Sequence, residues 1–406
     1  MLSVYLRAIN LGGLRTLLQK HHLSRYLVKH IHEPATPPVP NPFNMAAMHN
    51  TPDDILATGI MHPEFEAAWK ARGSPPGSMP TDVPTLKRIV EDSLPSLQAK
   101  LSATRPTDLT ETEHTVPLST GFTSRILLCH PTHPPSPTPS TRHLPSPIII
   151  LFHGGIHLLG FPEFDLPLAR RLAATHHATV LLPSTRKAPE SPFPTMLHDA
   201  WAALQAIAHD ASLPAGERTL LPEHADAAAG FVVGGASSGA NFADVVAHLA
   251  RDAGLRPAVT GLFFACGAFM DEGRVPAQYR ERYLSRKQNE NAPVADGRFM
   301  KAFVEAVNPD RGSPLWAPLV QEGCEGDVKM GHLGMPRAYF QVCGMDVNRD
   351  DGLIYESVLR EECGVATRLD LYSGFPHCWW DMYPELEASK KRAEDTMDGF
   401  KWLLSK

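Results

Sequence analysis

Two adjacent serines flanked by glycines stand in the segment FVVGGASSGANFADVVAHLA, residues 231–250. A serine hydroxyl can attack a carbonyl carbon when a tight turn between a strand and a helix exposes it above a sheet. The pattern G-x-S-x-G fits Gly235 to Gly239 with Ser237 at its centre, whereas centring on Ser238 would place alanines at both glycine positions. Ser237 is therefore the candidate nucleophile. A glycine-serine turn without chemistry is the alternative, because short matches to this pattern arise by chance.

A nucleophilic serine needs a base within hydrogen-bond reach and an acid that orients the base. Asp346 is the first carboxylate after the strand-like segment AYFQVCG, and His377 lies in the short loop after TRLDLY. These positions favour them as acid and base. Asp350 and Asp351 are rival acids, but they stand further on at a predicted helix start, where they are interpreted as charges facing the helix dipole.

Acyl transfer also needs N–H groups aimed at the oxygen on which negative charge develops. The strand-like segment PIIILF runs into His153 and two glycines, which let a backbone approach closely. The expected donors are Gly154, Gly155, Ile156 and Ser238. Trp379 and Trp380 follow the candidate base, and we expect them to narrow the substrate pocket.

The elements that must hold these residues alternate between strand and helix patterns. Strand patterns cover residues 148–152, 178–183, 231–233, 259–266, 338–344 and 367–372, and helical patterns include 166–176 and 196–210. From about residue 111, the segments TEHTVPL and SRILLC predict paired strands at a sheet edge. This alternation predicts an α/β fold, with a mostly parallel sheet covered by helices on both faces.

Two helical segments interrupt or precede this alternation, at about residues 52–101 and 268–312, and we interpret both as pieces of a cap. Residues 49–406 would then form one hydrolase domain. Residues 1–48 form an extension that includes the proline-rich linker PATPPVPNP.

Composition excludes several classes of protein. The net charge of −6 offers no broad basic face for nucleic acid, and no apolar run approaches the roughly 20 residues of a membrane span. The six cysteines are scattered without a C-x-x-C pair, which argues against a disulfide framework or a zinc site and favours a reducing, intracellular, cytoplasmic setting. No cofactor or metal is expected.

The first 32 residues carry five Lys or Arg side chains among apolar residues and no acid. Such a segment is typical of a mitochondrial presequence or of a helix that contacts an anionic membrane surface. An ordinary helical extension lying on the domain is the alternative.

Six short motifs, taken in order, resemble the hormone-sensitive-lipase-like carboxylesterases of the α/β-hydrolase superfamily. They are HGGI, TRKAPESPFP, GASSGAN, SPLWAP, DVNRDDG and GFPH. The resemblance runs from about residue 60 to the C-terminus. It implies an α/β-hydrolase fold, a nucleophile at Ser237, an acid at Asp346 and a base at His377. It also implies that His153 and Glu190 are mainly structural.

The sequence departs from the family pattern at several motif positions. Ile156 replaces the third glycine of HGGG, and Ala236 replaces an acidic residue before the nucleophile. Thr185 stands where a tyrosine is usual, and Val347-Asn348 stands where Pro-Leu is usual. These differences bear on the substrate more than on the fold.

The residues and the resemblance together predict a serine esterase for small or medium carboxylic esters, acting through an acyl-enzyme. An acyltransferase, an amidase or a product-releasing hydrolase of a biosynthetic pathway could use the same three residues. A lipase, or a binding protein that has lost the chemistry, are further alternatives.

Overall fold

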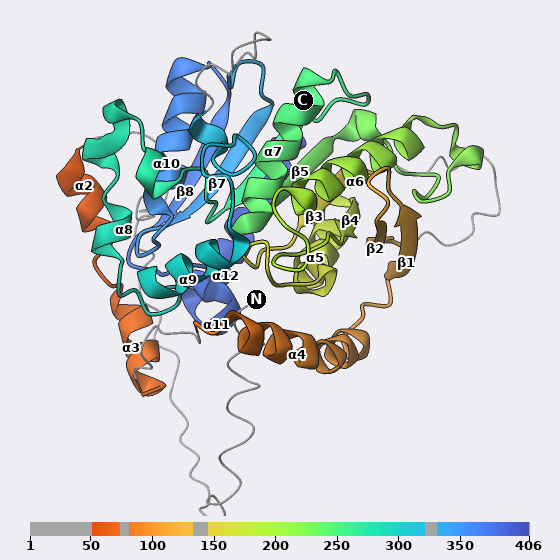
Figure 1. Ribbon diagram of the computed structural model, residues 1–406. Helices are drawn as coiled ribbons and strands as arrows, with labels where there is room; N and C mark the ends of the chain where they lie inside the picture. Colours follow the sequence, from red (N-terminus) through yellow and green to blue (C-terminus); the bar gives the residue numbers. More distant parts are fainter. Residues whose placement is uncertain (1–50, 74–80, 133–144, 321–330, 406) are drawn as a thin grey trace, which may run out of the picture.

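The computed structural model describes residues 51–73, 81–132, 145–320 and 331–405. The basic extension, with its expected membrane contact through residues 1–32, lies outside the described residues. An eight-stranded sheet crosses the molecule in the order β1-β2-β4-β3-β5-β6-β7-β8 (Figure 1). The strands are β1 Leu109–Pro117, β2 Thr123–Pro131, β3 Ile148–Phe152, β4 Thr179–Pro183, β5 Phe231–Ala236, β6 Gly261–Ala265, β7 Arg337–Cys343 and β8 Thr367–Tyr372.

The strand pairings confirm the predicted fold class. β1 pairs with β2, and β2 with β4, in antiparallel register, and the pairings from β4 through β8 are parallel. The segments TEHTVPL and SRILLC therefore lie at a sheet edge, as their alternation predicts. Parallel strands place their carboxyl ends at one edge, so the loops after β5, β6, β7 and β8 follow one another along that edge.

Helices cover both faces of this sheet. The α-helices of the described ranges are α2 Pro52–Ala57, α3 Pro63–Ala71, α4 Val83–Ala103, α5 Leu166–His176, α6 Thr195–Ser212, α7 Ser238–Asp252, α8 Ser285–Gln288, α9 Gly297–Val307, α10 Arg349–Ser357, α11 Trp379–Met382 and α12 Glu387–Leu403. Strand β3 shows how the two cores form. Ile148, Ile150 and Phe152 pack in a core with α6 and α7, whereas Ile149 and Leu151 pack in a second core with α5 and α12. Side chains alternate along a strand, so an all-apolar β3 serves both layers.

The helices near the start of the described chain contact loops that belong to the far end of the sequence. The Gly374 N–H donates to Thr58 O at 2.7 Å, and the His62 N–H donates to Gly374 O at 3.0 Å. The His62 ring also stacks on Phe375, with centroids 4.8 Å apart. The short segment between α2 and α3 thus holds the loop that carries His377.

Helix α4 is hydrogen-bonded to the segment Ala188-Pro189-Glu190, which belongs to the motif TRKAPESPFP. Lys87 Nζ donates to Glu190 Oε2 at 2.5 Å and to Ala188 O at 2.9 Å. The Glu190 side chain is largely exposed, whereas that of Lys87 is largely buried.

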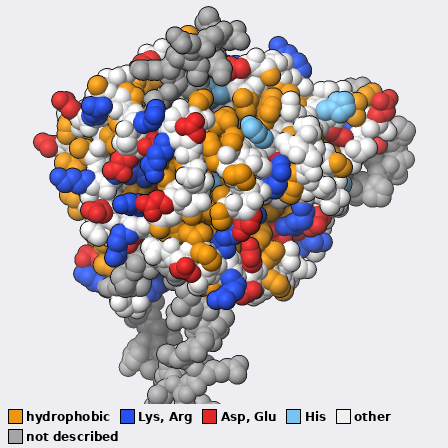
Figure 2. Space-filling view, viewed as in Figure 1, with side chains coloured by type: hydrophobic (Ala, Val, Ile, Leu, Met, Phe, Trp, Pro, Cys, Tyr) orange, Lys and Arg blue, Asp and Glu red, His pale blue; other side chains and the backbone are white. Residues whose placement is uncertain are grey.

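The surface shows two features that bear on the excluded classes. None of the helices in the described ranges is long and apolar enough to cross a membrane. On the face shown in Figure 2, Lys and Arg side chains are interspersed with Asp and Glu rather than gathered in one patch.

Candidate active site

Ser237 occupies a strained turn between β5 and α7. Its backbone angles are φ 58° and ψ −123°, a conformation that costs a residue with a side chain about 1–3 kcal/mol. The flanking glycines allow close packing: a Cβ added at Gly235 or Gly239 would lie 2.3 Å or 2.0 Å from Phe152 O. The Ser237 N–H donates to Ala265 O at 2.7 Å, which fixes the turn against β6. This geometry gives a physical reason for each residue of the G-x-S-x-G pattern.

His377 and Asp346 form a buried pair at the same edge of the sheet. His377 Nδ1 donates to Asp346 Oδ2 at 2.6 Å, and the two residues are 6% and 1% exposed. The other carboxylate oxygen, Oδ1, accepts the Asn348 N–H at 2.8 Å. Both carboxylate oxygens are therefore held by donors, which leaves Nε2 of the imidazole as the nitrogen that can accept a proton.

Opposing effects act on the pKa of His377. Burial disfavours the charged imidazolium, but the Asp346 carboxylate stabilises it, and the pKa is raised well above the ordinary value for histidine. The third member of a catalytic triad must stabilise the imidazolium form of the base, and the Asp346 carboxylate has this property.

The turn after β3 has the strained backbone expected of a site where N–H groups converge. Gly155, Ile156 and His157 have φ of 127°, 56° and 59°. A Cβ at Gly155 would lie 2.3 Å from Leu159 O, so this position requires glycine. Ile156, where the sequence departs from HGGG, adopts a positive φ that is unfavourable for a residue with a branched side chain.

A cavity of about 540 Å³ opens at Ser237. The turn residues Ile156, His157 and Ser238 line it, together with residues from the segment between β6 and α9. Apolar contributors include Met270, Met300, Val304, Trp316 and Val347, and charged ones include Asp271, Glu272, Arg286, Lys287, Glu290, Lys301 and Arg311. Residues 268–312 therefore form one wall of this cavity, as expected for a cap piece. The described part of residues 52–101, the other segment interpreted as a cap piece, contributes no residue to the lining of this cavity. Part of that segment contacts the loop that carries His377.

Trp379 and Trp380 do not line this cavity, so the expectation that they narrow it is corrected. Trp379 is fully buried among the rings of Tyr372 and Phe375, below the His377 loop. Trp380 lines a different cavity, and the Arg392 guanidinium lies 3.8 Å from its ring centroid. The loop thus turns Trp379 into the core and Trp380 toward the second cavity, directions that sequence distance from the base does not reveal.

Asp350 and Asp351 lie in the first turn of α10, at the helix start that the sequence predicts. Both are fully buried. Asp350 accepts the N–H groups of Leu284 and Ser285 at 2.5 Å each. Asp351 accepts two other backbone N–H groups, those of Phe269 and Met270, at 2.8 Å each. The two carboxylates thus fasten residues 268–312 to the start of α10.

Sequence reasoning missed Asn241, which belongs to the GASSGAN motif but was given no role. Its Nδ2 donates to Ala268 O at 3.1 Å and to Trp316 O at 3.0 Å, and its Oδ1 has no partner within the described structure. This amide therefore ties helix α7 to two walls of the cavity. Asn241 and Trp316 both belong to motifs recognised in the sequence, GASSGAN and SPLWAP, but nothing in the sequence shows that these two motifs are in contact.

The parallel sheet, the strained serine turn and the buried His-Asp pair define an α/β hydrolase. The chain belongs to the alpha/beta hydrolase fold family of hormone-sensitive-lipase-like proteins, which matches residues 149–381.

Known relatives agree with this assignment. A Schizosaccharomyces pombe protein named AB hydrolase superfamily protein B1A11.02 is 37% identical over 220 residues, which span 54% of this chain and 60% of that protein. The versiconal hemiacetal acetate esterase of Dothistroma septosporum is 27% identical over 64% of this chain and 74% of its own length. The chain thus spans less than two thirds of the first of these relatives.

Among solved structures, that of a vibralactone cyclase is similar with a TM-score of 0.72 and 26% identity, covering 86% of this chain and 96% of the other. A bacterial heroin esterase shares the fold, with a TM-score of 0.67, 21% identity and coverage of 85% and 98%. Another relative named as an esterase, carboxylesterase NlhH of Mycobacterium tuberculosis, is 29% identical over 55% of this chain and 63% of its own length.

Proposed function

We propose that this chain is a serine esterase that cleaves carboxylic esters of small or medium size through Ser237, His377 and Asp346. The strained backbone of Ser237, at the mouth of the cavity, is the observation that carries the proposal. Strain at a non-glycine residue persists only where the surrounding structure holds it, and functional sites are where it collects.

In the proposed first step, Ser237 Oγ attacks the ester carbonyl while His377 Nε2 takes its proton. Asp346 holds the imidazole in the Nδ1–H tautomer and stabilises the imidazolium that forms, through the 2.6 Å hydrogen bond. His377 then delivers the proton to the leaving alcohol, and an acyl-enzyme remains. Water, activated by the same imidazole, hydrolyses the acyl-enzyme and restores Ser237.

The oxyanion of the tetrahedral intermediate is proposed to accept N–H groups of the β3 turn and of Ser238. Gly154, Gly155 and Ile156 supply the turn, and Ser238 supplies the first N–H of helix α7. The helix N-terminus adds a favourable partial positive charge at that place. Removing one such donor in other acyl-transfer enzymes lowers turnover by roughly 10²–10³.

The cavity favours a substrate with an apolar part and polar substituents. Met300, Val304 and Trp316 offer apolar surface, whereas charged residues of the 268–312 segment offer partners for polar groups. We propose that this segment acts as a cap over the ester.

A second candidate keeps the three residues but changes the acceptor of the acyl group. It is favoured by the similarity to a vibralactone cyclase. If a hydroxyl of the acyl group itself replaces water, the acyl-enzyme yields a cyclic ester rather than an acid, and if the hydroxyl of a second molecule does so, that molecule is acylated.

The test combines labelling with turnover. A fluorophosphonate probe is expected to label the wild type and Ser238→Ala but not Ser237→Ala, and p-nitrophenyl esters of increasing chain length should be cleaved only by the first two. Wild-type labelling of Ser237→Ala would refute the assignment. Products formed from a hydroxy ester, separated by mass spectrometry, distinguish water from an internal hydroxyl as the acceptor.

A further inference from the structure

Three cysteines that are far apart in the sequence meet beside the proposed base. Cys266 directly follows β6, Cys343 ends β7, and Cys378 directly follows His377 after β8. All three thiols are free and buried, and Cys266 Sγ lies 3.1 Å from Cys343 Sγ. These strands are parallel neighbours, so residues at their carboxyl ends converge whatever their spacing in the sequence. The absence of C-x-x-C pairs therefore did not exclude a thiol cluster.

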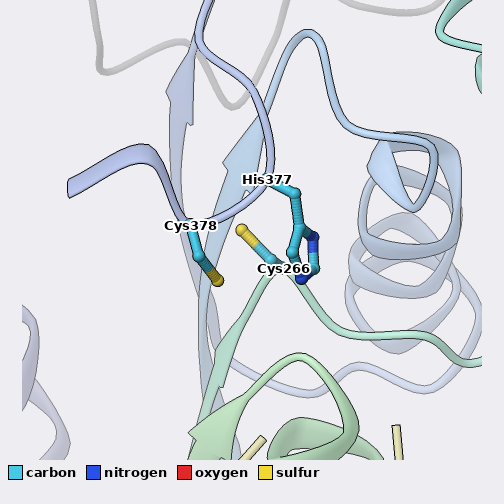
Figure 3. A group of neighbouring side chains, drawn as sticks. All are labelled: Cys266, His377 and Cys378. Carbon is cyan, nitrogen blue, oxygen red and sulfur yellow. The ribbon is translucent and has the colours of Figure 1, made fainter. Parts of the chain in front are cut away.

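The cluster has the donors and the spacing of a metal site. Cys266 Sγ, Cys378 Sγ and a ring nitrogen of His377 all lie within 4.8 Å of one another (Figure 3). Ligand atoms around a tetrahedral Zn²⁺ are about 3.8 Å apart, given Zn–S bonds of about 2.3 Å. The proposal requires side-chain rotations that bring these atoms closer by no more than about 1 Å. Cys266 also belongs to a second such group with Cys343 and Asp346, so a fourth ligand is close at hand.

We propose that Cys266, His377 and Cys378 bind a thiophilic cation such as Zn²⁺, and that the bound ion inactivates the enzyme. Thiolate and imidazole ligands favour Zn²⁺ or Cu⁺ over Mg²⁺ or Ca²⁺. Each cysteine releases its thiol proton to solvent when its sulfur binds, and the imidazole gives a lone pair. No electron is transferred, so the process is reversible by a chelator.

The ion would inactivate the enzyme whichever nitrogen of the His377 imidazole it binds, because the proposed reaction uses both nitrogens. If the ion binds Nδ1, it displaces the 2.6 Å hydrogen bond to Asp346 and the base loses its orientation. If it binds Nε2, it occupies the lone pair that must receive the Ser237 proton. An imidazole that coordinates the ion therefore cannot serve as the base of the proposed reaction.

The binding test is independent of hydrolysis. Full-length Ser237→Ala protein, first treated with a chelator, is dialysed against Zn²⁺ and, separately, against Co²⁺. We expect one ion per chain at this site and a thiolate-to-cobalt absorption band. Adding Cys266→Ala and Cys378→Ala should remove both signals, whereas adding Cys363→Ala, a more exposed cysteine elsewhere, should keep them. Thermal unfolding of each variant shows that it is folded. Failure of the parent protein to retain an ion, or retention by the variant lacking Cys266 and Cys378, would overturn the proposal.

The inhibition test rests on the proposed esterase function. Zn²⁺ should inhibit ester cleavage by the wild type, a chelator should restore it, and Mg²⁺ should have no effect. The single change Cys378→Ser should raise the inhibitory Zn²⁺ concentration at least about tenfold, and Cys363→Ser should leave it unchanged. Inhibition that a thiol reductant reverses and a chelator does not would identify an oxidised cysteine pair instead, and would also overturn the proposal. A protein that binds Zn²⁺ but cleaves no ester would refute the proposed function and leave the metal site standing.

Discussion

Replacing Asp346 with asparagine tests the proposed acid with little change in shape. In the wild type, the Asp346 carboxylate accepts two hydrogen bonds, from the Asn348 N–H at 2.8 Å and from His377 Nδ1 at 2.6 Å. An amide has only one oxygen. The backbone N–H can only donate, and turning the amide NH₂ toward it would cost about 1–3 kcal/mol for the unsatisfied donors. The oxygen should therefore stay with Asn348, and the NH₂ group should face the imidazole.

That orientation forces the wrong tautomer. An NH₂ group donates to Nδ1, so the proton of the imidazole moves to Nε2, and His377 can no longer accept a proton from Ser237. In an analogous triad this change lowers kcat about 10⁴-fold, which corresponds to about 5.5 kcal/mol of transition-state stabilisation. The assay is kcat on a short p-nitrophenyl ester, with the urea midpoint of unfolding measured in parallel. We expect Asp346→Asn to lose activity with a change in stability of no more than about 1–2 kcal/mol, because the change is isosteric.

Asp350→Asn is the matched control for this change. It stands four residues further on, and it pairs with the buried Arg349 as well as with backbone N–H groups. Losing its charge leaves a buried guanidinium without its carboxylate, which costs on the order of 3 kcal/mol of stability. We expect a lower unfolding midpoint but substantial turnover in the folded fraction. The reasoning is refuted if Asp346→Asn stays within about tenfold of wild type while folded Asp350→Asn loses 10³-fold or more.

Other predictions concern the turns, the base and the extension. Gly239→Ala should destabilise the fold by several kcal/mol, because its Cβ would lie 2.0 Å from Phe152 O, and a urea midpoint equal to wild type would contradict this. Activity should fall beyond about eight acyl carbons, and Ile156→Gly should shift the optimum to longer esters; a rate that rises to long chains in the wild type would favour a lipase. Because the pKa of His377 is raised, kcat/KM should rise with pH through a midpoint above 6.5. The stabilisation from the His377–Asp346 interaction should be full below pH 6.5 and should weaken as the pH rises through the folded-state pKa. A midpoint of the kcat/KM profile below pH 6.5 would contradict both predictions. A chain starting at Met48 should keep its kcat on a soluble ester but lose binding to anionic vesicles, measured by sedimentation; collapse of kcat/KM would assign the extension to the cap instead.

The positions of the proposed catalytic residues at strand ends could be predicted from the sequence because strand ends are local features. An apolar strand followed by a polar residue marks the sheet edge, and the order of strands along the chain then places Ser237, Asp346 and His377 on neighbouring loops. The glycines of the serine turn form a local pattern in the sequence, although the close approach of Phe152 that requires them is a contact with another strand.

Side-chain direction and contacts across the chain could not be predicted in the same way. Trp380 follows the base by three residues yet faces another cavity. Asn241 and Trp316 touch only because the sheet and the segment before β7 bring them together. The convergence of Cys266 and Cys343 depends likewise on strand order. Their strands, β6 and β7, are paired in the sheet, although the two cysteines are 77 residues apart in sequence.

The hydrogen bonds between Gly374, Thr58 and His62 have a consequence for synthesis of the protein. The loop that carries the proposed base is completed by residues from opposite ends of the described chain. While the C-terminal part is still inside the ribosome, the segment around Thr58 has no partner for these bonds. A nascent chain can therefore bury the strand that leads to Ser237 before the loop that carries the proposed base can be completed.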